Sequence, residues 1–311
     1  MITLPELDGR HVRLEPLQRR HAAGLAEAAA ADPSLYRLSP VPQGRAAAAG
    51  YIETALAQRD AGTAVPFAVT PVRDASHAGV FAPRHEDHVI AIAGATLIAD
   101  PAGALYWPDE RLLAVADLHL EKGSAFAARG VLLPPYDTAT TLARLARLIE
   151  RYRPGLVVAL GDSFHDGGGP ARMADASRAA LVALQRGRDW LWIAGNHDPD
   201  LPCDIGGRIA EVLSIGSLIF RHEPSAKTCD GEIAGHLHPL ARVARRGRGV
   251  SRRCFAVDGK RLVMPAFGAY AGGLNIRDRA IVALFGALSF TTHLLGDGRL
   301  YAIPAARCLS D

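Results

Sequence analysis

The sequence has few features of an exported or membrane protein. Its four cysteines form no CxxC pair and are far apart: Cys203, Cys229, Cys254 and Cys308. This spacing is typical of reduced thiols in the cytoplasm rather than of a disulfide framework or a zinc knuckle. The first residues, MITLPELDGR, lack the basic start and apolar core of a signal peptide. The longest apolar stretch, at about 280–295, is interrupted by glycine, threonine and histidine, so no segment reaches the roughly 18–20 apolar residues that span a bilayer. We therefore expect a cytoplasmic protein without a membrane partner.

The chain also lacks a strong excess of charge. The net charge is only +3, which excludes a globally basic nucleic-acid binder and leaves only local basic patches. Apolar residues make up 49% and charged residues 22%, the balance of an ordinary globular protein. At 311 residues the chain is long enough for two domains of about 150 residues each.

The pattern of the sequence changes near residue 80. The first part predicts a strand at His11–Leu14, helices at about 19–31 and 45–60, and a strand at Pro66–Thr70. Residues 74–87 show no period and predict a linker. We therefore expect an N-terminal segment at 1–73 and a second domain at 88–311.

In the second domain, short apolar runs alternate with amphipathic helices, which indicates βαβ units. Helices are expected at about 137–152, capped by Asp137 or Thr138, and at about 170–187. Later the pattern becomes rich in strands, which predicts two sheets with outer helices. The expected strands are Val89–Leu97, Leu112–Ala116, Leu156–Leu160, Leu191–Ala194, Leu218–Arg221, Glu232–Ala234, Arg252–Val257, Leu262–Met264, Ala280–Phe285 and Leu300–Ile303.

Polar residues follow five of these strands, each at the point where the strand ends. In open α/β sheets ligands gather beyond the carboxyl ends of the strands, so we expect the five loops to converge. In DLH and HLH the outer residues are two apart, so on a strand they would point the same way. Each motif alone is most often a turn or a buried histidine, but five in order make that interpretation improbable. The residues are Asp117, His119, Asp162, Asn196, His197, His222, His236 and His238.

These side chains supply enough oxygen and nitrogen donors for two metal ions, with Asp162 between them. The mixed set of imidazoles and carboxylates, with no cysteine, favours manganese, iron or zinc over magnesium or calcium. Two such ions ~3.5–4 Å apart clamp a phosphoryl group and lower the pKa of a shared water towards ~7. The sequence therefore predicts a two-metal phosphoesterase that uses an activated hydroxide. His197 would stabilise the phosphate charge or protonate the leaving oxygen. Asp198 would orient that imidazole or cap the following segment.

The motifs DLH, GDSFHD, GNHD and GHLH resemble those of the calcineurin-like metallophosphoesterases, and DLHLEKGSAFAARGVLLPPYDT and MPAFGAYAGGLN are similar to the DNA-ligase-associated (PdeM type) branch. The resemblance covers about 88–311 and implies a β-sandwich of two mixed sheets flanked by helices. It further implies an ester-bond hydrolase (EC 3.1) that cleaves DNA phosphodiesters, as an endonuclease or phosphodiesterase in damage repair, alongside a ligase and a helicase. Asp117, His119, Asp162 and His238 would hold one ion, most readily Mn²⁺, and Asp162, Asn196, His222 and His236 the other. His197 would be the catalytic histidine.

The second motif departs from the superfamily pattern GDxxDR. His165 stands where the aspartate usually does and Asp166 follows one place later, which leaves both roles open.

Basic residues near the motifs bear on the substrate. An arginine-rich stretch follows GHLH; it either grips a polyanion or only keeps a hairpin soluble. It consists of Arg242, Arg245, Arg246, Arg248, Arg252 and Arg253. Lys122 and His165 are further expected substrate contacts. The alternatives are a phosphatase or phosphodiesterase acting on small nucleotides or phosphoproteins, and a non-catalytic scaffold on the same fold.

Residues 5–72 resemble the first half of a GNAT acetyltransferase. The Gly-rich turn that would hold the cofactor pyrophosphate at a helix start does not follow Val69. We therefore expect a truncated GNAT-like appendage with no acetyl-CoA and no role in the chemistry. Half an α/β domain is not expected to close a core of its own.

Overall fold

The computed structural model describes residues 7–8, 12–31, 44–61, 66–71, 88–134, 136–199, 203–227, 229–245 and 248–311. The chain divides into two compact units, Met1–Pro83 and Arg84–Asp311. The division falls within the segment for which the sequence predicts a linker. Among the described residues, no helix is long and apolar enough to cross a membrane.

The N-terminal unit has a small apolar core of its own, which half a domain was not expected to close. The helix α2 buries Ala48, Ile52 and Leu56 at a spacing of four residues, so that they share one face. Leu17 packs with Ile52 and Leu56, and Leu25 and Ala68 surround them. The stretch after the last strand, where the sequence lacks a cofactor-binding turn, lies outside the described residues. The elements are the antiparallel strands β1 (Leu7–Asp8), β2 (Val12–Pro16) and β3 (Phe67–Pro71), and the helices α1 (Ala22–Ala31) and α2 (Arg45–Asp60).

The second unit begins with a seven-stranded mixed sheet in the order β10-β9-β8-β7-β6-β5-β4. Strands β7 to β10 run parallel to one another, and β4 to β7 form antiparallel pairs. All five residues of β7 are buried, as an entirely apolar strand predicts. The strands are β4 (His88–Ile92), β5 (Ala95–Ala99), β6 (Leu105–Trp107), β7 (Leu112–Ala116), β8 (Leu156–Leu160), β9 (Asp189–Ile193) and β10 (Arg208–Ala210).

A nine-stranded mixed sheet follows. Its path is β11-β12-β13-β16-β15-β14-β17, and β18 and β19 extend it from β15. Strands β12, β13 and β16 run parallel, and β15 joins β16 antiparallel. The strands are β11 (Val212–Ile215), β12 (Leu218–Arg221), β13 (Glu232–Ala234), β14 (Pro239–Arg245), β15 (Arg248–Val257), β16 (Arg261–Val263), β17 (Leu274–Asn275), β18 (Thr291–Leu295) and β19 (Leu300–Pro304).

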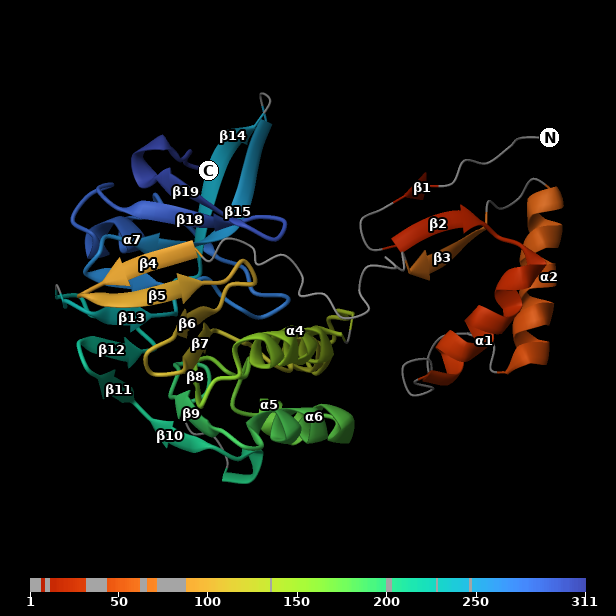
Figure 1. Cartoon of the computed structure of the whole chain (residues 1–311), viewed down its shortest axis with the longest axis horizontal. Helices are drawn as coiled ribbons and strands as arrows, with labels where there is room; N and C mark the ends of the chain where they lie inside the picture. Colours follow the sequence, from red (N-terminus) through yellow and green to blue (C-terminus); the bar gives the residue numbers. More distant parts are fainter. Residues whose placement is uncertain are drawn as a thin grey trace. The chain divides into compact units, whose positions relative to one another are not determined.

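Three apolar clusters hold these layers together. The largest joins residues of both sheets, such as Leu97 and Phe220, and so fills the space between them. A second packs the helices α4 and α6 on the first sheet, and a third packs α7 on the second sheet (Figure 1). The unit is therefore an α/β fold with two mixed sheets and outer helices, as expected. The helices are α3 (Lys122–Ala127), α4 (Asp137–Tyr152), α5 (Gly169–Arg172), α6 (Asp175–Gln185) and α7 (Arg279–Leu284).

Some expected elements differ in the structure. Ala280–Phe285, predicted as a strand, lies mostly in the helix α7. A short apolar run has no period that separates a buried strand from a helix. The Asp278 carboxylate accepts a hydrogen bond from the Ala280 amide (2.8 Å) and so caps the start of the helix. An aspartate at this position is a sequence signal for a helix start.

Two other elements are interrupted. The strand predicted at Val89–Leu97 is the hairpin of β4 and β5, which turns at Ala93 and Gly94, both with positive φ. The helix predicted at about 170–187 divides into α5 and α6, because Met173 and Ala174 adopt extended backbone angles.

The expected capping of α4 is wrong. The helix begins at Asp137, but its cap position, Tyr136, makes no side-chain capping bond. The Asp137 carboxylate accepts from the Gly123 amide (3.0 Å), and Thr138 Oγ1 accepts from the Glu121 amide (2.8 Å). These side chains fix the start of α3, which follows the first metal-ligand motif.

Candidate metal centre

The five loops with polar residues meet at one edge of the two sheets. Because the carboxyl ends of parallel strands lie side by side, the loops after β7, β8 and β9 come together there. The loops after β12 and β13 reach the same place from the second sheet. The loops carry Asp117 and His119 after β7, Asp162 after β8, Asn196 and His197 after β9, His222 after β12, and His236 and His238 after β13.

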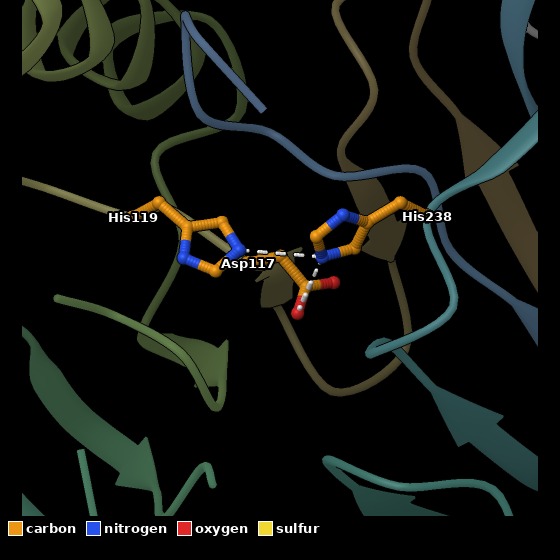
Figure 2. A group of neighbouring side chains, drawn as sticks. All are labelled: Asp117, His119 and His238. Atoms are coloured by element: carbon orange, nitrogen blue, oxygen red, sulfur yellow. Dashed lines mark hydrogen bonds and ion pairs between the residues drawn. The ribbon is translucent and has the colours of Figure 1, made fainter. Parts of the chain in front are cut away.

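Asp117, His119 and His238 form the first group of ligand atoms, all within 4.8 Å of one another. The His119 Nε2 and His238 Nε2 atoms are 3.3 Å apart, and His238 Nε2 is 3.3 Å from Asp117 Oδ1. Figure 2 shows the two imidazole rings facing each other, with the Asp117 carboxylate beside His238. These three side chains can hold one metal ion.

Asp162, His222 and His236 form the second group. The His222 Nε2 atom is 3.4 Å from Asp162 Oδ1 and 3.2 Å from His236 Nδ1. Asn196 adds an oxygen, because its Oδ1 is 2.9 Å from the same His222 nitrogen. The two motifs therefore contribute to the groups in different ways. In DLH, Asp117 and His119 both belong to the first group. In HLH, His236 belongs to the second group and His238 to the first.

Asp162 lies between the two groups. Its Oδ1 faces His222, and its Oδ2 is 4.0 Å from His119 Nε2 in the first group. One carboxylate can therefore contact an ion in each group, the bridging position that the sequence predicts for Asp162.

The donor set fits divalent cations. Two atoms bound to one metal at about 2.0–2.1 Å lie roughly 3.0–3.4 Å apart, close to the separations within each group. Among the described residues, the ion pairs of Asp117 and Asp162 are with histidines only, so no lysine or arginine neutralises these buried carboxylates. Burial lowers the pKa of His119 to about 2, helped by repulsion from His238 and His197, so its ring is neutral. Burial also lowers the pKa of His236. Neutral imidazole is the form that binds metal.

The backbone at the ligands is strained. Asp117, Asp162 and His236 have φ of 53°, 44° and 69°, and His119 and His238 have φ of 42° and 46°. Side chains other than glycine rarely adopt this left-handed region, and such outliers concentrate at functional sites. The outer residues of DLH and HLH therefore converge through left-handed backbone beyond the strand ends, not through the alternation of a strand.

Glycines next to the ligands allow this close approach. A Cβ on Gly161, whose φ is +69°, would collide with the His222 ring. A Cβ on Gly235 would lie 2.7 Å from Asp117 Oδ2. Each position needs glycine because another ligand occupies the space of its side chain.

The segment 265–274 supports two ligands through its backbone. The Gly268 amide donates to the Asp117 carbonyl (3.0 Å), and the Leu274 amide donates to the His238 carbonyl (3.1 Å). The Arg253 guanidinium holds the segment by donating to the carbonyls of Ala266, Ala269 and Ala271 (3.0–3.3 Å). Sequence reasoning placed Arg253 only in a basic stretch, because nothing in its spacing marks a contact across the fold.

Lys122 also contacts this segment. Its Nζ donates to the Tyr270 carbonyl (3.0 Å), and burial lowers its pKa. Lys122 therefore uses one of its three donors on a backbone oxygen, and its contact with substrate stays a prediction.

His197 lies beside the two groups and is 43% exposed. Its Nδ1 is 2.9 Å from the His165 carbonyl, which accepts the proton of that nitrogen and leaves Nε2 facing the groups, 3.9 Å from Asp162 Oδ2. The expectation that Asp198 orients this ring is wrong, because the backbone carbonyl of His165 takes that place. The buried Asp198 carboxylate accepts from the Phe164 amide (2.9 Å), and burial raises its pKa to about 7.

His165 and Asp166 have separate roles. The His165 ring stacks on His197, with centroids 5.6 Å apart, and burial lowers its pKa. Asp166 forms an ion pair with Arg172 (2.6 Å) and accepts from the Gly168 amide (3.0 Å). His165 therefore faces the site, whereas Asp166 shapes its own loop.

The arginine-rich stretch is the hairpin of β14 and β15, whose register pairs Arg245 with Arg248. Arg246 and the side chains of Arg245 and Arg248 lie outside the described residues. Of the neighbouring arginines, Arg252 is exposed and donates to the Ser251 carbonyl (3.1 Å).

Comparisons with known proteins agree with this geometry. Residues 110–249 match the family model described as calcineurin-like phosphoesterase. The crystal structure of nuclease MPE from Pseudomonas putida is similar, with 28% identity and a TM-score of 0.55 over 70% of this chain and 100% of that one. The structure of Yfce, a phosphoesterase from E. coli, matches with 14% identity and a TM-score of 0.32 over 62% of this chain and 98% of that one. No curated protein matches the chain significantly.

The family match covers the loops that carry the ligands of both groups. The comparisons therefore support a calcineurin-like phosphoesterase domain at residues 110–249.

Proposed function

We propose that the Arg84–Asp311 unit is a two-metal phosphodiesterase that cleaves DNA, most readily with Mn²⁺. The observation that carries this proposal is the pair of ligand groups joined by Asp162. A single buried carboxylate that faces two sets of imidazoles is suited to two ions at the spacing of a phosphoryl group.

The chain's own residues account for the remaining steps. Bound divalent ions would supply charge for the phosphoryl oxygens and a hydroxide near neutral pH. His197 is exposed enough to meet the substrate, and the His165 carbonyl keeps its Nδ1 protonated. A second proton on Nε2 can then pass to the leaving oxygen, which makes His197 the general acid. The Asp198 carboxylate accepts a hydrogen bond from the Phe164 backbone amide and so acts on the loop after β8.

The surface beside the site supports a nucleic-acid substrate. Leu132 and Tyr136, in the loop between α3 and α4, are 87% and 54% exposed. This loop is tied to the site by a hydrogen bond from the Tyr270 hydroxyl to the Pro134 carbonyl (3.0 Å). Exposed aromatic and apolar side chains offer stacking surfaces to unpaired bases. Arg129 is close enough to His165 for its positive charge to contribute to the lowered pKa of that histidine. The nuclease named among the similar structures supports the same substrate class.

The proposal places the protein in DNA damage repair, as an endonuclease or phosphodiesterase that works in the cytoplasm with a ligase and a helicase. The test is metal analysis of the purified chain together with hydrolysis of nicked, flapped and single-stranded DNA and of a chromogenic diester. We expect two ions per chain and cleavage of at least one DNA substrate. Hydrolysis of the dye without cleavage of any DNA would reject the DNA assignment, and absence of both activities with metal bound would favour a scaffold.

A second candidate is an esterase for small nucleotides or phosphoproteins, which the partly exposed His197 would also serve. Replacing Arg245, Arg246 and Arg248 together by alanine separates the two. If the substrate is DNA, DNA cleavage falls and depends less on salt while dye hydrolysis stays unchanged. An equal fall in both would assign these arginines to structure.

The N-terminal unit has no part in this proposal. We expect no acetyltransferase activity and no acetyl-CoA binding by the full chain. Saturable binding of acetyl-CoA in a calorimetric titration would overturn that expectation.

A further inference from the structure

A second charged cavity lies at the opposite ends of the strands that carry the metal ligands. It has a volume of about 420 Å³. Three arginines, Arg111, Arg153 and Arg188, line it together with a single acidic residue, Glu150. Ala146, Ile149 and Pro154 supply an apolar wall.

The three arginines occupy equivalent places before three parallel strands. Arg111 directly precedes β7, Arg188 directly precedes β9, and Arg153 lies three residues before β8 begins at Leu156. The register aligns Leu112 with Leu156, so these strand starts lie at one edge of the sheet. The Gly155 amide donates to the Arg111 carbonyl (2.8 Å), and the Asp189 amide donates to the Gly155 carbonyl (2.8 Å). These bonds join the turns before β7, β8 and β9, and the arginines of the three turns line the same cavity.

The positive charge of this cluster is not balanced within the described residues. None of the three guanidinium groups forms an ion pair with a carboxylate there, Glu150 included. The Arg188 Nε atom is buried without a hydrogen-bond partner. Within the described residues, the Arg111 guanidinium donates a hydrogen bond to the Arg153 carbonyl (3.0 Å). A buried donor without a protein partner needs another acceptor, such as a water molecule or a bound anion.

The backbone of the cluster is also strained. Arg111 and Arg153 have φ of 47° and 45°, in the left-handed region that side chains other than glycine, asparagine and aspartate seldom adopt. Glycine or asparagine would relieve this strain at both positions. Arg153 takes this conformation at the C-cap of α4, where helices commonly end in it, and Arg111 takes it directly before β7.

We propose that this cavity binds a phosphate group, carried by a nucleotide or by a nucleic-acid strand. Arginine presents a planar fork of donors that matches phosphate oxygens, and three forks around a concave site surround one phosphate. The volume lies in the range of small-molecule sites, and the apolar wall leaves room for a base or sugar beside the phosphate. This site is separate from the metal centre and does not depend on the function proposed for that centre.

The test measures binding of inorganic phosphate to the full chain by equilibrium dialysis, with its metals bound and after their removal by a chelator. Arg188→Ala and Arg153→Gly each remove one guanidinium, and glycine keeps the left-handed backbone at position 153. We expect each to weaken the chelator-insensitive binding at least about tenfold, since each deletes hydrogen bonds to a charged group. Glu150→Gln should tighten binding by removing the one negative charge.

Arg147→Ala is the matched control. Arg147 is exposed and lies in α4, the helix that contributes Ile149 and Glu150 to the cavity lining, but Arg147 itself does not line the cavity. It should change binding less than about twofold, as one exposed charge contributes little. All variants should melt and hydrolyse the diester dye as the parent does. Absence of chelator-insensitive binding in the parent, or equal loss in Arg147→Ala and Arg188→Ala, overturns the proposal.

Competition distinguishes the sources of the phosphate. Adenosine monophosphate that displaces inorganic phosphate at a concentration about tenfold lower assigns a nucleotide. A 12-residue oligonucleotide that displaces it with a dependence on Arg188 assigns a nucleic-acid strand. If neither competes better than inorganic phosphate, the attribution to nucleotides and nucleic acid is wrong.

Discussion

The two ends of β7, β8 and β9 carry opposite chemistry. At the carboxyl ends, buried carboxylates and imidazoles form a place for cations. At the amino ends, three arginines line a cavity whose lining contains one acidic residue, Glu150. Both ends contain residues in left-handed backbone. One set of apolar strands thus supports two polar sites, because a parallel sheet gathers its loops by end and keeps the ends a strand length apart.

Removing the bridging charge should have the largest effect, and only at the carboxyl ends. Asp162→Asn keeps the shape but loses the carboxylate shared by the two groups. We expect dye hydrolysis to fall by roughly 10³–10⁵-fold, since the charge stabilisation that metals supply is worth several kcal/mol. Metal analysis should find at most one tightly bound ion. Asp189→Asn, an exposed aspartate at the start of β9, should retain both ions and full activity. Two ions in Asp162→Asn would contradict the bridging role.

His197→Ala should separate metal binding from proton transfer. We expect dye hydrolysis to fall by about 10²–10³-fold, the contribution of a general acid, with metal content unchanged. The loss should be smaller for a diester whose leaving group is a weak base, because that group needs no proton. Hydrolysis at the parent rate would exclude His197 from catalysis.

Arg253→Met should weaken the carboxyl-end site from a distance. It leaves the carbonyls of Ala266, Ala269 and Ala271 without their donor and loosens the segment that bonds to Asp117. We expect metal affinity to fall by about 10–100-fold, the usual effect of groups behind the ligands. Arg252→Met is the matched control, because this neighbouring arginine is exposed and bonds only to Ser251. Equal metal affinity in the two variants would show that Arg253 does not support the metal ligands.

A histidine pair that lies outside both sites should make the stability of the unit depend on pH. The His88 Nε2 and His293 Nδ1 atoms lie 2.5 Å apart where β4 meets β18, and burial lowers the pKa of both rings, that of His293 to about 4. Between pH 6.5 and about 4 the unfolded chain binds more protons at this pair than the folded chain does, so the stability that the pair contributes falls as the pH decreases through this window. The Asp198 carboxyl, whose pKa burial raises to about 7, contributes in the opposite direction. With metals saturating, we expect Tm to fall by a few degrees between pH 7 and pH 5. His293→Leu should flatten this dependence. An unchanged slope would show that another group governs it.

The metal ligands could be predicted from the sequence because each follows an apolar strand, and strand ends of one sheet converge. Their conformation could not be predicted, since left-handed backbone at Asp117 or His238 leaves no trace in residue type. The helix α7 was missed for a different reason: its apolar run is too short for a period, and the cap at Asp278 was overlooked. The orientation of His197 depends on the backbone carbonyl of His165. Because every residue has such a carbonyl, the residue types could not predict this contact.

The arginines before the strands show the same limit. Arginine is common on protein surfaces, and the sequence alone does not place three of them around one cavity. Their convergence follows from the register of β7 and β8 and from the turns before them. The fold class, which depends on alternating apolar runs, was easier to predict than either site.

The full burial of β7 has a consequence for motion. Amide protons in such a strand exchange with solvent only when the whole unit unfolds, whereas the partly exposed loop at His197 can open by itself. Asp117 lies one residue beyond β7 and His197 lies four beyond β9. We therefore expect slow amide exchange in the strand before Asp117 and faster exchange in the loop that carries His197.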